Sequence, residues 1–188
     1  MKKIIVLTFV LMLLPCIALA TMNTSADALS LTMQWQRDNG YDFPVYGDTT
    51  ADLSLISDFL SLLEENGIYI KLPDLSIVNN DGYDRIYSKV ADSFYLTYIW
   101  YFDTAKCSLE LQVPRSYRPM DEALKLLMVY MLSMSEDEAT KLYSDLQYNV
   151  IDDLCIMEYT DYFISYYEPR YSNGELMDFV SLCVEKAY

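Results

Sequence analysis

Apolar and polar side chains alternate with a period of two over several stretches of the chain, which is typical of β-strands. The strongest stretch is residues 94–102, where both faces of the alternation are apolar or aromatic. Such a strand belongs inside a sheet and is covered at least in part on each side. Residues 107–113 alternate strictly between apolar and polar positions, so we expect a strand with one face on the core and one on water.

Shorter alternating stretches predict five more strands, four of which form two hairpins. Asn80-Asp81-Gly82 is a favourable turn for the first hairpin, and Thr160-Asp161 is the tight turn of the second. The strands that flank these turns are residues 75–79, 83–90, 154–159 and 162–168. The fifth strand, residues 68–72, is ended by Pro73, which cannot donate to a ladder.

Apolar residues three to four positions apart predict three helices. The first is capped by Thr49 or Thr50 and ends at Asn66-Gly67, where glycine allows a left-handed stop. Ser135 and Glu138 have the spacing of a capping box at the start of a later helix. This helix and the one before it form a helical hairpin over residues 121–134 and 135–147.

Three segments are less sharply defined by their pattern. Residues 25–39 fit a helix and an extended strand almost equally, and residues 41–47 fit a loop or an edge strand. Residues 174–186 fit a helix better than a strand, because a strand would place Asp178 on an otherwise apolar face. The strand remains the alternative there.

The expected order of elements is helix, strands, helical hairpin, strands, without a regular alternation of strand and helix. This order predicts an α+β fold in which an antiparallel sheet, or two such sheets, packs against helices. We expect one compact domain over residues 21–188. Two sub-halves that meet near residues 114–119 are an alternative arrangement, although no residue-level repeat supports a duplication.

Residues 1–20 have the features of a secretory signal peptide: a basic start, an apolar run and a small-residue cleavage site ending at Ala20. Cleavage there predicts a secreted or cell-envelope protein that begins at Thr21. A retained signal that acts as an anchor is the alternative.

The chain is acidic, with 28 Asp and Glu against 13 Lys and Arg and a net charge of −15. Cleavage of the signal would remove Lys2 and Lys3 and bring the net charge to −17. This charge disfavours nucleic acid as a partner, and it disfavours membrane contact beyond the signal peptide. Arg115 and Arg118 are expected to be counter-charges to the nearby acidic residues 121 and 122.

Three cysteines remain after cleavage, so the mature chain allows at most one internal disulfide. Cys155 and Cys183 share the C-terminal segment and are the expected pair. Three buried, unpaired cysteines, with Cys107 as the third, are an equally good alternative.

The absence of histidine from the chain excludes catalysis by a histidine-activated nucleophile and metal binding through imidazole. Neighbouring carboxylates are the remaining acid–base groups, and they occur at Asp152-Asp153, at Glu158 with Asp161, and at residues 136–138. Turns and helix starts explain these carboxylates without catalysis. We therefore expect no catalytic residue, no metal site and no cofactor, although the sequence alone leaves enzymatic activity open.

The 18 tyrosines are the most informative feature of the composition. Tyrosine offers a large, fairly rigid contact area with a polar tip and is enriched at interfaces. The expected contact residues lie in and just after the C-terminal hairpin, and they are Tyr159, Tyr162, Tyr166 and Tyr171.

These observations favour an exported, acidic, non-enzymatic binding protein that uses a tyrosine-rich sheet surface. The expected partner is a basic protein surface or a glycan, because the chain is acidic and rich in aromatic side chains. A carboxylate-dependent hydrolase acting on envelope glycan and a purely structural envelope component are the alternatives. The oligomeric state is left open.

Overall fold

The computed structural model describes residues 43–187, apart from residues 103 and 105. The signal peptide and the segment 25–39, with its open choice of helix or strand, lie outside the described residues. All described residues belong to the compact unit Phe43–Tyr188.

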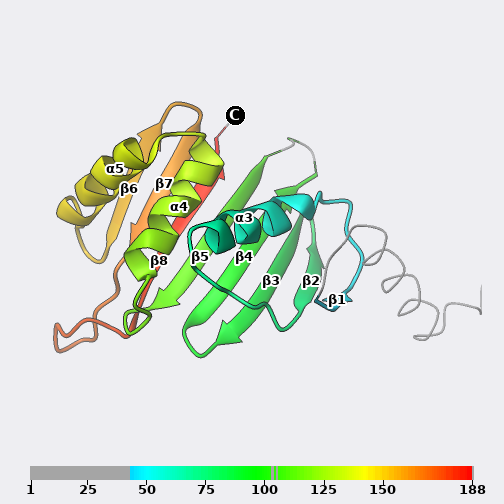
Figure 1. Ribbon diagram of the computed structural model, residues 1–188, viewed down its shortest axis with the longest axis horizontal. Coiled ribbons are helices and arrows are strands. Elements are labelled where there is room, and N and C mark those ends of the chain that lie inside the picture. Colours follow the sequence, from blue (N-terminus) through cyan, green and yellow to red (C-terminus); the bar gives the residue numbers. More distant parts are fainter. Residues whose placement is uncertain (1–42, 103, 105, 188) are drawn as a thin grey trace, which may run out of the picture. The chain divides into compact units, whose positions relative to one another are not determined.

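Eight strands form one mixed sheet in the order β1-β2-β3-β4-β5-β8-β7-β6 (Figure 1). The strands are β1 (Val45–Tyr46), β2 (Leu75–Asn80), β3 (Tyr83–Ala91), β4 (Phe94–Tyr101), β5 (Cys107–Pro114), β6 (Leu154–Tyr159), β7 (Tyr162–Tyr167) and β8 (Phe179–Lys186). All neighbours are antiparallel except β1, which runs parallel to β2. The α+β class is confirmed. The sheet is mixed rather than antiparallel throughout, and the predicted order of elements holds only in part because β1 precedes the first described helix.

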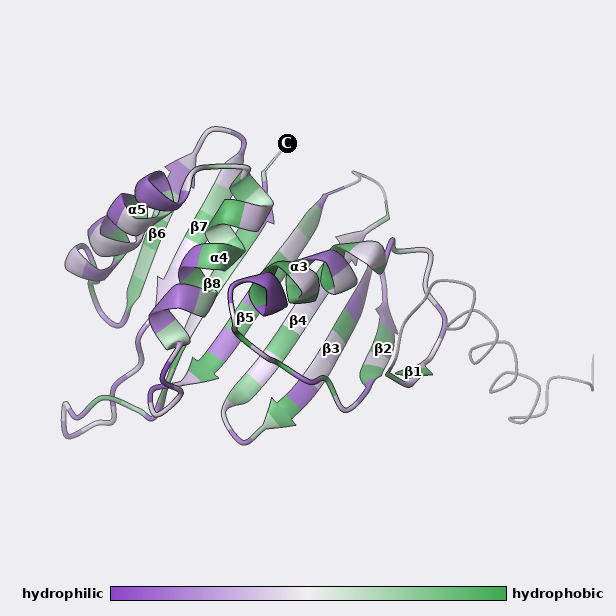
Figure 2. Cartoon of the chain, in the orientation of Figure 1, coloured by the Kyte–Doolittle hydropathy of each residue, from purple (hydrophilic) through white to green (hydrophobic). Residues whose placement is uncertain are grey.

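Three helices lie on one face of this sheet: α3 (Ser54–Glu65), α4 (Met120–Leu132) and α5 (Glu136–Tyr148) (Figure 1). Helix α4 contacts β5 and β8, α5 contacts β6, and α4 also contacts the other two helices. The core fills the space between the helices and the sheet and is built from fully buried side chains such as Phe59, Leu124 and Leu109. Figure 2 shows apolar residues alternating with polar ones along the strands.

The helix ends follow the predicted signals in part. Ser135 and Glu138 form the predicted capping box at the start of α5. Helix α3 starts later than predicted, at Ser54, and no side chain caps it. The Thr49 hydroxyl accepts the Ala51 N–H over 3.0 Å and donates to Asp84 Oδ2 over 2.6 Å. Hydrogen bonds from the Ser54 side chain and from the Ser54 N–H, the latter over 3.0 Å, hold the pKa of Asp52 below its usual value.

Two segments differ from the sequence-based prediction. Residues 68–72 form no strand. The segment predicted as a helix at 174–186 contains β8, which lies between β5 and β7 and buries Val180, Leu182 and Val184. Asp178 precedes β8, and its carbonyl accepts the N–H of Arg115 over 3.1 Å. The carboxylate that argued against a strand therefore lies outside it.

Candidate binding face

Side chains of successive residues in a strand point to opposite faces of a sheet. Tyr98, Leu109, Ile164 and Val184 point toward the helices and are 0–1% exposed. Their neighbours in each strand point the other way, to a face on which none of the described helices lies. We call it the helix-free face, and in strands β2 to β8 it consists of Ser76, Val78, Asn80, Tyr83, Arg85, Tyr87, Lys89, Tyr95, Thr97, Ile99, Tyr101, Ser108, Glu110, Gln112, Leu154, Ile156, Glu158, Phe163, Ser165, Tyr167, Phe179, Ser181, Cys183 and Glu185.

The register of the strands arranges this face in three rows that cross the sheet from β3 to β6. Each row places directly paired residues side by side, in the strand order β3, β4, β5, β8, β7, β6. The first row is Arg85, Ile99, Ser108, Glu185, Phe163 and Glu158; the second is Tyr87, Thr97, Glu110, Cys183, Ser165 and Ile156; the third is Lys89, Tyr95, Gln112, Ser181, Tyr167 and Leu154.

The centre of the face is small and polar. Thr97, Ser108 and Ser181 are 4–6% exposed there, next to the carboxylates of Glu110 and Glu185. Burial raises the pKa of the Cys183 thiol to about 12, and the charges of these two carboxylates add to the shift. A thiol with so high a pKa is protonated and a poor nucleophile at neutral pH, so Cys183 is a structural side chain.

Cations lie on tyrosine rings at the β3 side of the face. The Arg85 guanidinium is 5.3 Å from the centre of the Tyr87 ring, and the Lys89 ammonium is 5.8 Å from the centre of the Tyr95 ring. Lys89 also forms an ion pair with Asp92 over 2.8 Å. Both distances are within the range of a cation–π contact, and aromatic and arginine side chains dominate binding energy at protein interfaces.

Apolar side chains are exposed at the opposite side of the face, on β6 and β7. Ile156 is 61% exposed, Phe163 40%, Tyr167 39% and Leu154 39%. The rings of Tyr167 and Phe179 lie 6.3 Å apart, at the end of β7 and the start of β8. A contiguous apolar surface on a water-exposed sheet is a feature of binding sites.

The structure separates the four predicted contact tyrosines. Tyr166 is 1% exposed and points toward the helices, where its ring contacts that of Tyr143 at 5.7 Å. The prediction that Tyr166 is an exposed contact residue is therefore wrong. Tyr159 and Tyr162 are paired on the same side of the sheet as the helices and are half-buried, whereas Tyr171 is exposed in the connection between β7 and β8.

The tyrosines that do lie on the helix-free face were not singled out from the sequence, except as part of the apolar strand 94–102. They are Tyr83, Tyr87, Tyr95, Tyr101 and Tyr167. The alternation of Tyr83, Arg85 and Tyr87 on one face of a strand was the available signal, but the pattern does not reveal which face the helices cover.

The predicted disulfide is also wrong, because the three described cysteines are free. Cys155 pairs with Tyr166, and Tyr166 pairs with Leu182, so Cys155 and Cys183 are two strands apart and on opposite faces. Two strand spacings amount to about 9–10 Å, beyond the roughly 7 Å between Cα atoms that a disulfide allows.

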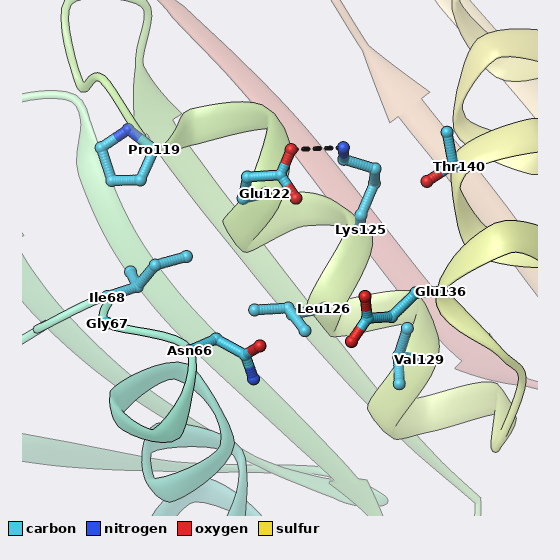
Figure 3. A pocket seen from close by; sticks show the side chains of 10 residues that line it. All are labelled: Asn66, Gly67, Ile68, Pro119, Glu122, Lys125, Leu126, Val129, Glu136 and Thr140. Atoms are coloured by element: carbon cyan, nitrogen blue, oxygen red, sulfur yellow. Dashed lines mark hydrogen bonds and ion pairs between the residues drawn. The ribbon is translucent and has the colours of Figure 1, made fainter.

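A pocket of about 260 Å³ lies on the other side of the molecule, where the end of α3 meets α4 and the start of α5 (Figure 3). Glu122 forms an ion pair with Lys125 at this pocket, and Glu136 lines it from α5. A carboxylate hydrolase needs a carboxylic acid with a raised pKa. Among the described residues, the carboxyl groups with a shifted pKa are Asp52, Asp92 and Glu138, and the pKa of each is lowered.

No group of three or more cysteine, aspartate or glutamate side chains that could hold a metal ion occurs among the described residues. Within the same part of the chain, no helix is long and apolar enough to cross a membrane. Comparison with protein-family models, with curated proteins and with solved structures found no match to this chain.

Proposed function

We propose that this protein is an exported binding protein and that the helix-free face is its contact surface. The observation that carries the proposal is the group of exposed apolar and aromatic side chains on β6 and β7, which consists of Leu154, Ile156, Phe163 and Tyr167. Exposed apolar patches on soluble proteins mark interaction sites. The signal-like residues 1–20 support export.

Binding fits the chemistry of the face better than catalysis does. The chain has no histidine, and the thiol at the centre of the face, Cys183, has a pKa raised to about 12. Tyrosine and small hydroxyl side chains dominate the remainder of the face, which also carries Arg85, and interfaces are rich in tyrosine and arginine.

The charge of the molecule is distributed unevenly between its two sides. Helix α5 carries Glu136, Asp137, Glu138 and Asp145 against Lys141 alone, while strands β3 to β8 contribute two cations and three carboxylates to the helix-free face. The overall negative charge would attract a basic partner from a distance, with a rate that falls as salt rises. The contact itself would form on a surface that is close to neutral.

The experiment compares retention of envelope proteins and glycans by three immobilised forms of the chain 21–188. They are the wild type, the double variant Tyr87→Ser/Tyr167→Ser, and Tyr148→Ser. Tyr148 is 90% exposed on α5 and is the matched control. We expect the control to retain the same partner as the wild type. The amount of partner retained by the double variant should fall at least about tenfold, because aromatic anchors carry much of the binding energy. Equal retention by all three forms would contradict the proposal.

A hydrolase is the second candidate, because Glu122 and Glu136 both line one pocket. If this pocket hydrolysed envelope glycan, the wild-type protein would release reducing sugar ends, and the variants Glu122→Gln or Glu136→Gln would not. We expect no release by the wild type in the first place.

A further inference from the structure

We propose that the free edge of β6 binds an extended, basic segment of another protein, which adds a further strand to the sheet. This inference rests on the proposed function, because it names the kind of partner and the side of the binding face at which that partner attaches. Two features of the edge support it, its unpaired main-chain groups and its charge.

The main-chain groups of β6 are unpaired along part of its outer side. β6 is the last strand of the sheet and pairs with β7. In an antiparallel pair, the N–H and C=O of one residue point to the neighbouring strand, and those of the next residue point away. Leu154 exchanges main-chain hydrogen bonds of 3.0 and 3.1 Å with Ile151, on the side away from β7. The main-chain groups of Ile156 and Glu158 therefore also point away from β7, and no residue in the described part of the chain pairs with them.

This edge lacks the usual protection against strand addition. Natural sheets protect their edges with prolines, bulges or a covering segment. β6 contains no proline, its register with β7 has no bulge, and the turn at Ile151 pairs with Leu154 alone. The side chains of Ile156 and Ile151 are 61% and 75% exposed. The edge beyond Leu154 is therefore open to an extended peptide held by main-chain hydrogen bonds.

The surroundings of the edge are strongly acidic. Residues 136–161, which comprise α5, β6 and the turns that follow them, contain eight carboxylates and one cation, Lys141. Glu158 is exposed on the edge strand itself, and Asp161 is exposed in the turn after it. A second copy would bring an identical acidic edge against this one and be repelled, whereas a basic segment is attracted.

Helix α5 adds carboxylates on its side nearest the edge. Successive residues turn by about 100° around a helix axis. Glu136 lines the pocket beside α4, so Glu138 and Asp145 project from the opposite side of α5. Helix α4 contacts β5 and β8, whereas α5 contacts the outermost strand, β6 (Figure 1). The side of α5 that faces away from α4 therefore lies toward the free edge.

The strand geometry defines which side chains the added segment needs. We take the pairing to be antiparallel, which is the more stable arrangement per residue. Residues of the segment opposite Ile156 and Glu158 lie on the helix-free face, and the residue between them lies on the side of α5. An apolar residue fits opposite Ile156, a basic one opposite Glu158, and a second basic one between them, on the side of the acidic helix. In its own direction the segment reads basic–basic–apolar.

The test is an NMR titration of the chain 21–188 with the peptide Ser-Thr-Lys-Lys-Val, blocked at both ends. The main-chain amide signals of Ile156 and Glu158 are followed. We expect both signals to shift, with a dissociation constant below about 1 mM. The charge control is the same peptide with glutamate in place of both lysines, which should bind at least about tenfold more weakly.

Methylation of single peptide nitrogens tests the main-chain pairing. The nitrogens of the first lysine and of valine would donate to Glu158 and Ile156, so methyl groups on these two should abolish the shifts. The nitrogen of the second lysine points away from β6. A methyl group there is the matched control and should leave the affinity within about threefold of that of the unmodified peptide.

On the protein, Ile156→Pro removes the outward N–H and leaves the ladder to β7 intact, at a position where sheets tolerate proline. It should lower the affinity for the lysine peptide at least about tenfold, whereas Ile156→Ala keeps the N–H and should lower it less. Circular dichroism and the melting temperature check that both variants fold. The methylated peptides test the same hydrogen bonds on the wild type, whether or not Ile156→Pro folds.

Unchanged signals of Ile156 and Glu158 with the lysine peptide, equal binding of the glutamate peptide, or equal effects of the two methylation patterns would each overturn the inference. Signals that shift with protein concentration and not with peptide would overturn it in favour of a second copy. The proposed function fails separately. If immobilised Ile156→Pro retains the partner that Tyr87→Ser/Tyr167→Ser loses, the binding face stands and only strand addition falls.

Discussion

Asp84 is a carboxylate inside the core, at 2% exposure, and its two oxygens have different partners. Thr49 donates its hydroxyl proton to Oδ2 over 2.6 Å, and the Asn79 amide donates to Oδ1 over 2.7 Å. The same Asn79 amide reaches the carbonyl of Asp48 over 3.0 Å. Asp84 thereby fixes the segment between β1 and α3 against the hairpin of β2 and β3.

Replacing Asp84 by alanine should destabilise the fold by about 2–3 kcal/mol, because two hydrogen bonds to a buried carboxylate are lost. Asp84→Asn keeps one acceptor oxygen and should cost less. Urea unfolding measures both free energies. An Asp84→Ala variant as stable as the wild type would show that this hydrogen-bond network does not hold the segment.

Ser88 presents the opposite case, since it is fully buried under the helices and its hydroxyl has no hydrogen-bond partner among the described residues. Removing an unsatisfied buried hydroxyl relieves a desolvation cost. We expect Ser88→Ala to be neutral or to raise the free energy of unfolding by up to about 1 kcal/mol. A loss of more than about 1 kcal/mol in the same urea assay would be inconsistent with an unpaired hydroxyl.

At the scale of elements, Arg115 connects the end of β5 to the long segment between β7 and β8. It pairs with Glu168 over 2.8 Å, and its Nε donates to the carbonyl of Met177 over 2.9 Å. Its position in the sequence predicts instead that it balances the charges of residues 121 and 122, which are closer in the chain. The actual partners come from a distant segment because β8 pairs with β5.

Arg115→Ala should lower the free energy of unfolding by about 1–2 kcal/mol, since a partly buried carboxylate and a carbonyl lose a charged donor. Arg115→Lys should recover only part of this loss, because an ammonium cannot reproduce the planar two-nitrogen contact. Thermal unfolding of the wild type, Arg115→Ala and Arg115→Lys measures the order of their stabilities. Full recovery by lysine would mean that charge alone matters here.

Local sequence patterns predicted most helices and strands, but they did not predict which strands pair when these are far apart in the sequence. The hairpin turn at residues 80–82 and the capping box at Ser135 are specified by a few neighbouring residues, and both are present. The region of β8 was predicted as a helix because its apolar residues fit the period of a helix as well as that of a strand. It forms a strand because it pairs with β5 and β7 on either side. The buried position of Tyr166 was missed for the same reason: alternation defines two faces, but helices from distant segments determine which one is covered.

At the scale of the whole molecule, the titrating groups set an upper limit to the stable pH range. Burial raises the pKa of Tyr130 and of Cys183 to about 12 each, from ordinary values of 10.0 and 9.0. Burial also raises the pKa of Tyr143, whose hydroxyl donates to Asp121 over 2.8 Å. In each case the folded state holds its proton more tightly than the unfolded chain does.

A raised pKa of this kind contributes stability below the unfolded pKa, and this contribution is lost as pH rises toward the folded pKa. We therefore expect the free energy of unfolding to fall steadily from about pH 9 upward. Tyr143→Phe should make the fall above pH 10 shallower, because it removes one such group. Urea unfolding at a series of pH values measures both, and a flat profile from pH 8 to 11 would contradict the burial of these groups.

The central claim is that the helix-free face is the contact surface, and hydroxyl-radical labelling tests it most directly. The chain 21–188 is labelled in dilute pure solution and again in the native envelope fraction, and modification of single residues is measured by mass spectrometry. The account predicts that Tyr87, Ile156 and Tyr167 are protected in the envelope fraction, while Tyr148 on α5 is modified equally in both. Protection of Tyr148 with unchanged labelling of the other three would contradict it.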